Sequence, residues 1–226
     1  VMETANGDTS TVSTSTNVEV STVEDLELGT NANNTLTGNG DDEFIYGYDG
    51  NDTIDADKGD DLIDGGAGND TIDAGDNDDL IYGGAGNDTI DGEKGEDYIY
   101  GGAGDDILTG GNQNDTFAWE AGDEGTIATP AIDTITDFNL TGNAGQADQI
   151  DLSDLLQGVT PDSLDSYLHF SYSGGDTTIE ISTTGDVDSS HNQEIIVQGV
   201  DLTGGMSSDA DIIESLLSGN KLIIDM

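Results

Sequence analysis

The chain has 226 residues, with 49 acidic residues against three lysines and no arginine, and its formal net charge is −46. A polyanion of this strength repels nucleic acid and anionic membranes, and it attracts cations. There is no cysteine to form disulfides and no run of about 18 apolar residues to span a membrane. Because self-repulsion on this scale opposes compaction, we expect folding to require a bound cation.

The N-terminal segment, residues 1–28, is rich in Ser, Thr and Asn and predicts a flexible linker. It has neither the cationic start nor the apolar stretch of a secretory signal peptide. Since the chain starts at Val1 and not at Met, we expect it to be part of a longer protein.

Residues 29–118 carry a nine-residue repeat without a slip in phase. The repeated apolar positions are Leu36, Ile45, Ile54, Ile63, Ile72, Ile81, Ile90, Ile99, Leu108 and Phe117. An acid or amide stands two positions before each: Asn34, Glu43, Asp52, Asp61, Asp70, Asp79, Asp88, Asp97, Asp106 and Asp115. A fixed period of this kind predicts one structural unit repeated along an axis, with the apolar residues in its core.

The most regular copies, residues 65–73, 83–91 and 101–109, combine glycines with the fixed aspartate. Glycine adopts positive φ, so a glycine-rich turn can direct successive carbonyl oxygens towards one point. Carboxylate and carbonyl oxygens suit a hard cation such as Ca²⁺. His and Cys are absent from this block, which argues against zinc and copper.

The pattern Gly-Gly-x-Gly-x-Asp-x-apolar-x resembles the RTX repeats, a family of calcium-binding nonapeptides. The resemblance implies an all-β parallel β-roll with two nonapeptides per coil and about five coils. A mixed, mainly β cap with short helices would follow. Carboxylates 18 residues apart would then stack and share several Ca²⁺ ions between coils.

Two columns of calcium ligands follow from this resemblance. The first contains Asp52, Asp70, Asp88 and Asp106, with the motif glycines Gly50, Gly68, Gly86, Gly65, Gly83 and Gly101. The second contains Glu43, Asp61, Asp79, Asp97 and Asp115. In the second column the fourth position of the repeat is less regular, because Asn77 and Gln113 stand where glycine is expected.

The residues beside the buried position point outward and give the roll two different faces. One face carries threonines and aspartates, such as Thr71 and Asp73, and the other is aromatic and apolar, such as Leu80 and Tyr82. A threonine ladder could bind ice or another polymer, although the aspartates beside it argue against ice. The aromatic face predicts packing against residues 119–226 or the N-terminal linker, and contact with another molecule is the alternative.

Beyond residue 118 the repeat stops and ordinary mixed patterns appear. The patterns predict strands at residues 131–138, 177–182, 194–200 and 221–224, short helices at 152–156 and 162–168, and an amphipathic helix at 208–217.

The segments Asp133-Thr134-Ile135-Thr136-Asp137-Phe138 and Asp148-Gln149-Ile150-Asp151-Leu152-Ser153 resemble the D-x-I-x-D-F…D-x-I-D-L-S sequence that follows RTX blocks in type I-secreted proteins. The resemblance implies that residues 119–226 are a cap with an uncleaved C-terminal secretion signal. It makes further candidate calcium ligands of Asp133, Asp137, Asp148 and Asp151.

Residues 110–226 also look like the C-terminal module of very large repetitive adhesins. That resemblance implies secretion to the surface of a Gram-negative bacterium. The expected partners are calcium, the type I secretion machinery during export and the rest of an adhesin chain upstream. No nucleic acid and no membrane insertion are expected. The alternatives are the tail of a secreted protease or lipase, or an ice- or polymer-binding solenoid.

Catalysis is poorly supported by the sequence. His169 and His191 stand alone, and the chain has no His-Glu-x-x-His helix and no Gly-x-Ser-x-Gly motif. The repeat explains the many paired acids better than acid–base chemistry does. The sequence therefore predicts a non-enzymatic chain.

Overall fold

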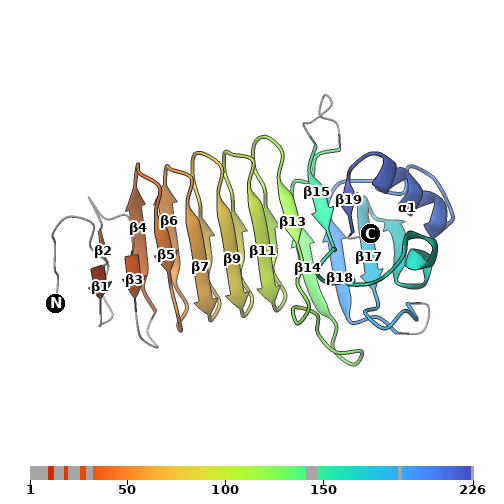
Figure 1. Ribbon diagram of the computed structural model, residues 1–226, viewed down its shortest axis with the longest axis horizontal. Coiled ribbons are helices and arrows are strands. Elements are labelled where there is room, and N and C mark those ends of the chain that lie inside the picture. The colour runs from red at the N-terminus through yellow and green to blue at the C-terminus, as the bar shows by residue number, and fades with distance from the viewer. Residues whose placement is uncertain are drawn as a thin grey trace.

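The computed structural model describes residues 33–140, 147–187 and 190–224, together with the backbone of three short strands at residues 10–12, 18–19 and 26–28. Two sheets run along the long axis of the molecule (Figure 1). Among the described residues the first sheet has nine strands, in the order β1 (Ser10–Val12), β3 (Leu26–Leu28), β5 (Phe44–Tyr46), β7 (Leu62–Ala67), β9 (Leu80–Ala85), β11 (Tyr98–Ala103), β13 (Thr116–Ala118), β15 (Gln149–Asp151) and β19 (Leu222–Ile223).

The second sheet has ten strands among the described residues, in the order β16 (Leu168–Ser173), β17 (Asp176–Ile181), β18 (Gln193–Val197), β14 (Ala131–Ile135), β12 (Ile107–Thr109), β10 (Thr89–Asp91), β8 (Thr71–Asp73), β6 (Thr53–Asp57), β4 (Thr35–Asn39) and β2 (Val18–Glu19). Consecutive strands of the repeat block thus alternate between the sheets, and each nonapeptide supplies one strand and one turn.

Strand pairing within the roll is parallel and keeps the sequence period. Ile72 of β8 lies beside Ile54 on one side and Ile90 on the other, each 18 residues away. All ten repeated apolar side chains are at most 1% exposed, so they form the core between the two sheets. The prediction of a parallel β-roll with two nonapeptides per coil is confirmed.

Both sheets continue past the end of the sequence repeat. Strand β14 pairs in parallel with β12, and β15 pairs in parallel with β13. The second sheet then adds β18 in parallel and ends with the antiparallel strands β17 and β16. The mainly β cap is therefore built onto the ends of the same two sheets, and one apolar core extends from Leu36 to Leu222.

The cap contains one 3₁₀ helix, η1 (Pro161–Ser166), and among the described residues one α-helix, α1 (Asp209–Ser218). The Ser208 side chain accepts a hydrogen bond from the Asp211 N–H and begins α1, as expected of an N-cap serine. Ile212, Ile213 and Leu216 bury one face of the helix. No helix in the described part of the chain is long and apolar enough to cross a membrane.

The elements predicted in the cap are mostly present, with three differences. The helix predicted at residues 152–156 is replaced by turns at 153–158, because so short a segment does not offset the cost of starting a helix, although Leu152, Leu155 and Leu156 are buried. The helix predicted at 162–168 is the shorter η1. Strands β15 and β16 were not predicted. Strand β15 has three residues and pairs only with strands distant in sequence, whereas β16 forms a hairpin with β17, the next strand along the chain.

The predicted linker at residues 1–28 lies largely outside the described residues. Within it, β1, β2 and β3 pair in parallel with β3, β4 and β5 and so extend both sheets towards the N-terminus. The domain boundaries near residues 28 and 118 stay predictions.

Candidate metal centre

The repeated acids lie in two columns along the edges of the roll, where turns follow one another from coil to coil. Eight aspartates of the repeat are each only 1–3% exposed: Asp52, Asp61, Asp70, Asp79, Asp88, Asp97, Asp106 and Asp115. Charged carboxylates are rarely buried to this extent without a partner. The environment of each oxygen atom therefore decides what the columns can do.

One carboxylate oxygen of each aspartate is held by the preceding coil. The Asp70 backbone N–H donates to Asp88 Oδ1 at 2.8 Å, and the Asp79 N–H donates to Asp97 Oδ1 at 2.9 Å. The same bond recurs along both columns from Asn34 and Glu43 onward, at 2.6–3.1 Å. These bonds fix the rotamer of every carboxylate and aim its other oxygen into the turn.

The other oxygen has no hydrogen-bond partner. Among the described residues, Oδ2 of all eight repeat aspartates is buried and unpaired, and so is Oε1 of Glu43. A buried, unpaired carboxylate oxygen is strongly unfavourable unless a cation neutralises it. The residues present therefore fit a row of hard cations.

Glycine makes room for this arrangement. A Cβ added to Gly83 would lie 2.7 Å from Asp88 Oδ2 and 2.5 Å from the carbonyl oxygen of Gly101. Gly65 and Gly101 are similarly crowded by Oδ2 of Asp70 and Asp106. Carboxylate and carbonyl oxygens of neighbouring coils thus converge beside the first glycine of each motif.

The described residues contain no group of three or more His, Cys, Asp or Glu side chains converging on one point. An ion in either column would therefore be held by carboxylates together with backbone carbonyl oxygens, a donor set that suits Ca²⁺. The glycines at the fourth position of the repeat serve the turn: Gly50, Gly68 and Gly86 have φ of 137°, 144° and 137°.

Burial changes the acidity of the columns. Desolvation raises the pKa of Asp88 to about 6, of Asp70 to about 7 and of Asp79 to about 8. The pKa values of Asp97 and Asp106 are raised to about 8 by burial and by neighbouring carboxylates. Protons and cations therefore compete for the same oxygens near neutral pH.

The two columns differ in regularity, as predicted. Asn77 and Gln113 occupy glycine positions of the second column with φ of 95° and 93°, where side chains are strained. The residue before each ligand also differs. On the first edge Asn51, Asn69 and Asn87 form a neutral ladder of hydrogen bonds, whereas Asp60, Asp78 and Glu96 occupy the second edge. The second edge is thus the more acidic, and Asp76 there pairs with both Lys58 and Lys94.

The C-terminal acids fall into two groups. Asp133 and Asp148 extend the columns, because they accept from the N–H groups of Asp106 and Asp115 at 2.9 and 3.1 Å. Their second oxygens are hydrogen-bonded: Asp133 Oδ2 accepts from Trp119 Nε1 and Gln193 Nε2, both at 2.7 Å, and Asp148 Oδ2 accepts from the Asn139 N–H at 2.7 Å. Each column therefore ends on a carboxylate whose oxygens are satisfied by the protein.

Asp137 and Asp151 lie outside the columns. Asp137 accepts from the N–H groups of Gly110 and Gly111 at 3.0 and 2.8 Å. Asp151 accepts from the Tyr98 hydroxyl and from Ser153. Their role as calcium ligands stays a prediction. In the structure both side chains join the cap to the roll, and Asp151 also stabilises the turn at Ser153.

Sequence reasoning did not identify Trp119 and Gln193, which are 1% and 0% exposed and end the first column. A partial signal existed, because Asp133-Thr134-Ile135 and Asp148-Gln149-Ile150 repeat the Asp-x-apolar spacing of Asp70-Thr71-Ile72. Asp133 and Asp148 follow the preceding column members, Asp106 and Asp115, by 27 and 33 residues, so the nonapeptide period is lost and the signal is hard to detect.

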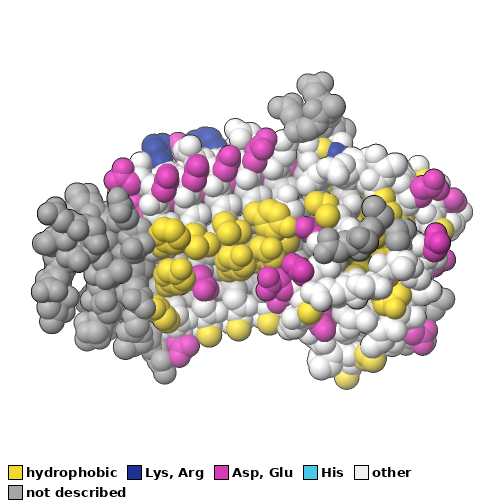
Figure 2. Space-filling view, in the orientation of Figure 1, with side chains coloured by type: hydrophobic (Ala, Val, Ile, Leu, Met, Phe, Trp, Pro, Cys, Tyr) yellow, Lys and Arg dark blue, Asp and Glu magenta, His cyan; other side chains and the backbone are white. Residues whose placement is uncertain are grey.

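The outer faces of the sheets also differ as predicted. Figure 2 shows an apolar band across the face of the first sheet. Within this band the rings of Tyr82 and Tyr100 stack, with their centroids 4.7 Å apart, and the Tyr98 hydroxyl donates a hydrogen bond to Asp151 of the cap. Phe44 and Tyr48 remain 44% and 38% exposed. Among the described residues, the band is therefore bonded to the cap at its C-terminal end, and its other end stays exposed at Phe44.

Comparison with known proteins agrees with this geometry. Residues 28–63, 57–90 and 82–117 match the family described as RTX calcium-binding nonapeptide repeat (4 copies). The chain therefore contains an RTX repeat block, and such blocks are calcium binders typical of secreted extracellular proteins. No curated protein sequence matches the chain.

Solved structures of other proteins are similar in part. The AlgE6R3 subunit of the Azotobacter vinelandii mannuronan C5-epimerase is 26% identical, with a TM-score of 0.47, over 73% of this chain and 79% of that one. The AlgE6R2 subunit of the same epimerase is 21% identical, with a TM-score of 0.38, over 84% and 91%. Extracellular lipase LipA from Serratia marcescens is 16% identical, with a TM-score of 0.38, over 92% of this chain and 41% of the lipase.

Proposed function

We propose that the chain is a calcium-dependent folding and export module at the C-terminus of a secreted or cell-surface adhesin. The observation that carries the proposal is the row of buried aspartate Oδ2 atoms that have no partner among the described residues. Folding the roll without a cation would bury these carboxylates unneutralised, or require each to take up a proton.

Calcium would thus act as a switch on folding. In a cytoplasm with little free calcium, repulsion among the acids opposes the roll and leaves the repeat block open for export. Extracellular calcium modules commonly bind with Kd of about 10⁻⁴–10⁻³ M, so millimolar calcium outside the cell folds it. Folding outside would then hinder backward movement through the exporter.

The export part of the proposal rests on the resemblance of residues 133–138 and 148–153 to segments of type I-secreted proteins. By that resemblance an uncleaved signal lies towards the C-terminus, within residues 119–226. The adhesin assignment has the same basis, and a tail of a secreted protease or lipase is the alternative. The sequence upstream of Val1 separates them, because tandem immunoglobulin-like repeats indicate an adhesin and a catalytic motif indicates an enzyme.

Calcium titration of the chain after chelation tests the switch. We expect β-sheet circular dichroism to be lost in chelator and to return cooperatively between roughly 0.1 and 1 mM calcium. Magnesium at the same concentration is the control, because its octahedral preference fits carbonyl-rich turns poorly. A spectrum that chelator leaves unchanged would refute the proposal.

Export is tested separately by fusing residues 119–226 to a passenger protein in a cell with a type I exporter. We expect the passenger in the medium with the C-terminal residues still attached. Retention of the passenger inside the cell would contradict the export role and leave the calcium switch standing.

A further inference from the structure

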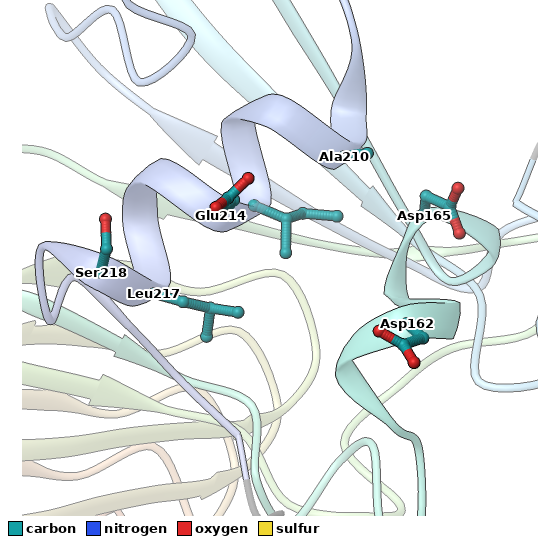
Figure 3. Close-up of a pocket in the computed structure, with 7 residues that line it drawn as sticks. Asp162, Asp165, Ala210, Glu214, Leu217 and Ser218 are labelled. Atoms are coloured by element: carbon teal, nitrogen blue, oxygen red, sulfur yellow. The ribbon is translucent and has the colours of Figure 1, made fainter.

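A groove of about 670 Å³ lies between η1 and α1 in the cap (Figure 3). Its floor is apolar, because Ile213 is buried and Leu217 is half-buried. Its rim carries three exposed carboxylates, with Asp162 and Asp165 on η1 and Glu214 on α1. Apolar contact and concentrated negative charge therefore occur in one concave surface, away from the carboxylate columns.

The rim carboxylates have no ion-pair or hydrogen-bond partner in the part of the chain that the structure describes. The chain itself has little to offer them, since it has three lysines and no arginine. Lys58 and Lys94 both pair with Asp76, and none of the ion pairs among the described residues joins a lysine to the rim. A cation that neutralises this rim would therefore come from another molecule.

The end of α1 adds to the negative field. Leu217 and Ser218, in its last turn, line the groove. That turn contains no basic residue, and the carbonyl groups at a helix C-terminus carry partial negative charge. A cation bound beside Ser218 would therefore be favoured by the helix dipole as well as by the carboxylates.

Two other occupants fit less well. The described residues hold no cluster of three acids converging on a metal, so the rim does not form a metal site. A second copy of the chain carries the same charge of −46 and would be repelled. The groove has the size of sites that take a few side chains, and its charge selects a basic occupant.

We propose that this groove docks a segment of a partner protein in which an arginine or lysine stands next to an apolar residue. The cationic head would lie among Asp162, Asp165 and Glu214, and its aliphatic stem would cover Leu217. The neighbouring apolar side chain would reach the floor at Ile213.

A steric test locates the contact without changing charge. The probe is a fluorescein-labelled Arg-Leu-Arg-Leu peptide, measured by anisotropy with the full chain in millimolar calcium and near-physiological salt. Ala210→Trp fills the groove, and Ser215→Trp adds the same side chain at an exposed position of α1 outside the lining. We expect Ala210→Trp to weaken binding at least about fivefold and Ser215→Trp to have little effect. Equal effects would overturn the proposal.

A charge test separates the groove from the general field of the chain. The variant Asp162→Asn/Asp165→Asn/Glu214→Gln is compared with Asp55→Asn/Asp73→Asn/Asp91→Asn, which removes the same charge from the outer face of the second sheet. We expect the groove variant to weaken binding of the peptide about tenfold, and the sheet variant to weaken it less than about twofold at this ionic strength. Equal weakening, or binding of a citrulline-leucine peptide as tight as the probe, would contradict the proposal.

Discussion

The roll (residues 33–118) and the cap (residues 119–224) share the same two sheets but bury different kinds of groups. The roll buries one large apolar side chain per nonapeptide beside a carboxylate with an unpaired oxygen. The cap buries apolar side chains from several strands and from α1. Asp133 and Asp148, the two buried acids with which it extends the columns, are hydrogen-bonded through both carboxylate oxygens. The need for a cation is therefore set coil by coil and ends where hydrogen-bond donors of the protein replace the cation.

Calcium removal should produce the largest difference between the two regions. In chelator we expect the amides of β8 and β10 to lose hydrogen-exchange protection by orders of magnitude, because their coils then bury unneutralised charge. Amides of β17 and β18 should lose less, since the core around Ile179 and Ile195 contains no unpaired carboxylate. Hydrogen-exchange mass spectrometry measures this, and uniform loss would show that roll and cap unfold as one unit.

Acid should partly replace calcium in the roll. The pKa of Asp70 is raised to about 7 and that of Asp79 to about 8 in the metal-free fold, above the ordinary value of 3.8. The fold therefore binds extra protons, and its stability is greatest below pH 4 and is lost as pH rises through 6–8.

Circular dichroism in chelator should accordingly show more β-sheet at pH 5 than at pH 8. With calcium present we expect more β-sheet at pH 8 than at pH 5. The calcium concentration at the midpoint of folding should rise as pH falls, because protons compete with calcium for Oδ2. A metal-free spectrum independent of pH would contradict the desolvation of the columns.

Gly83→Ala should destabilise the calcium-bound roll by about 2–3 kcal/mol, because the new Cβ overlaps Asp88 Oδ2 and the Gly101 carbonyl. The control is Gly174→Ala in the β16–β17 hairpin, where φ is 74° and no atom lies within 4 Å of the new Cβ. That change should cost about 1 kcal/mol from backbone strain alone. Denaturant unfolding in saturating calcium compares them, and equal losses would show that the glycine serves only the backbone.

Trp119→Phe should have a smaller effect, which tests the boundary between the regions. It removes the Nε1–H donor to buried Asp133 Oδ2 and should cost about 1–2 kcal/mol. The loss should be similar with and without calcium if the protein alone satisfies this last rung. Tyr98→Phe, which removes the part-buried bond to Asp151, is the milder control. A loss seen only in calcium would mean that Asp133 acts as a metal ligand.

Much of the roll could be predicted from residues alone. The nine-residue phase predicts the core positions, because every copy places its apolar residue at the same point of the repeat. The alternation of sheets and the 18-residue register were implied by the resemblance to RTX repeats, in which two nonapeptides form one coil. The resemblance also identifies Asp70 and Asp88 as column members, since the same turn recurs at every copy. The cap could be predicted only as approximate elements, because its strand pairs join distant segments such as β14 and β18.

The charge, the period and the oxygen ligands of the repeat can be read from the residues themselves, because they are local features that recur in ten copies. The tertiary structure was needed to show that Asp133 and Asp148 continue the two columns across insertions, and that Trp119, Gln193 and the Asn139 N–H end them. It also decided the groove between η1 and α1, which joins residues about 50 positions apart. Contacts of this kind depend on how whole elements pack, and no local pattern records them.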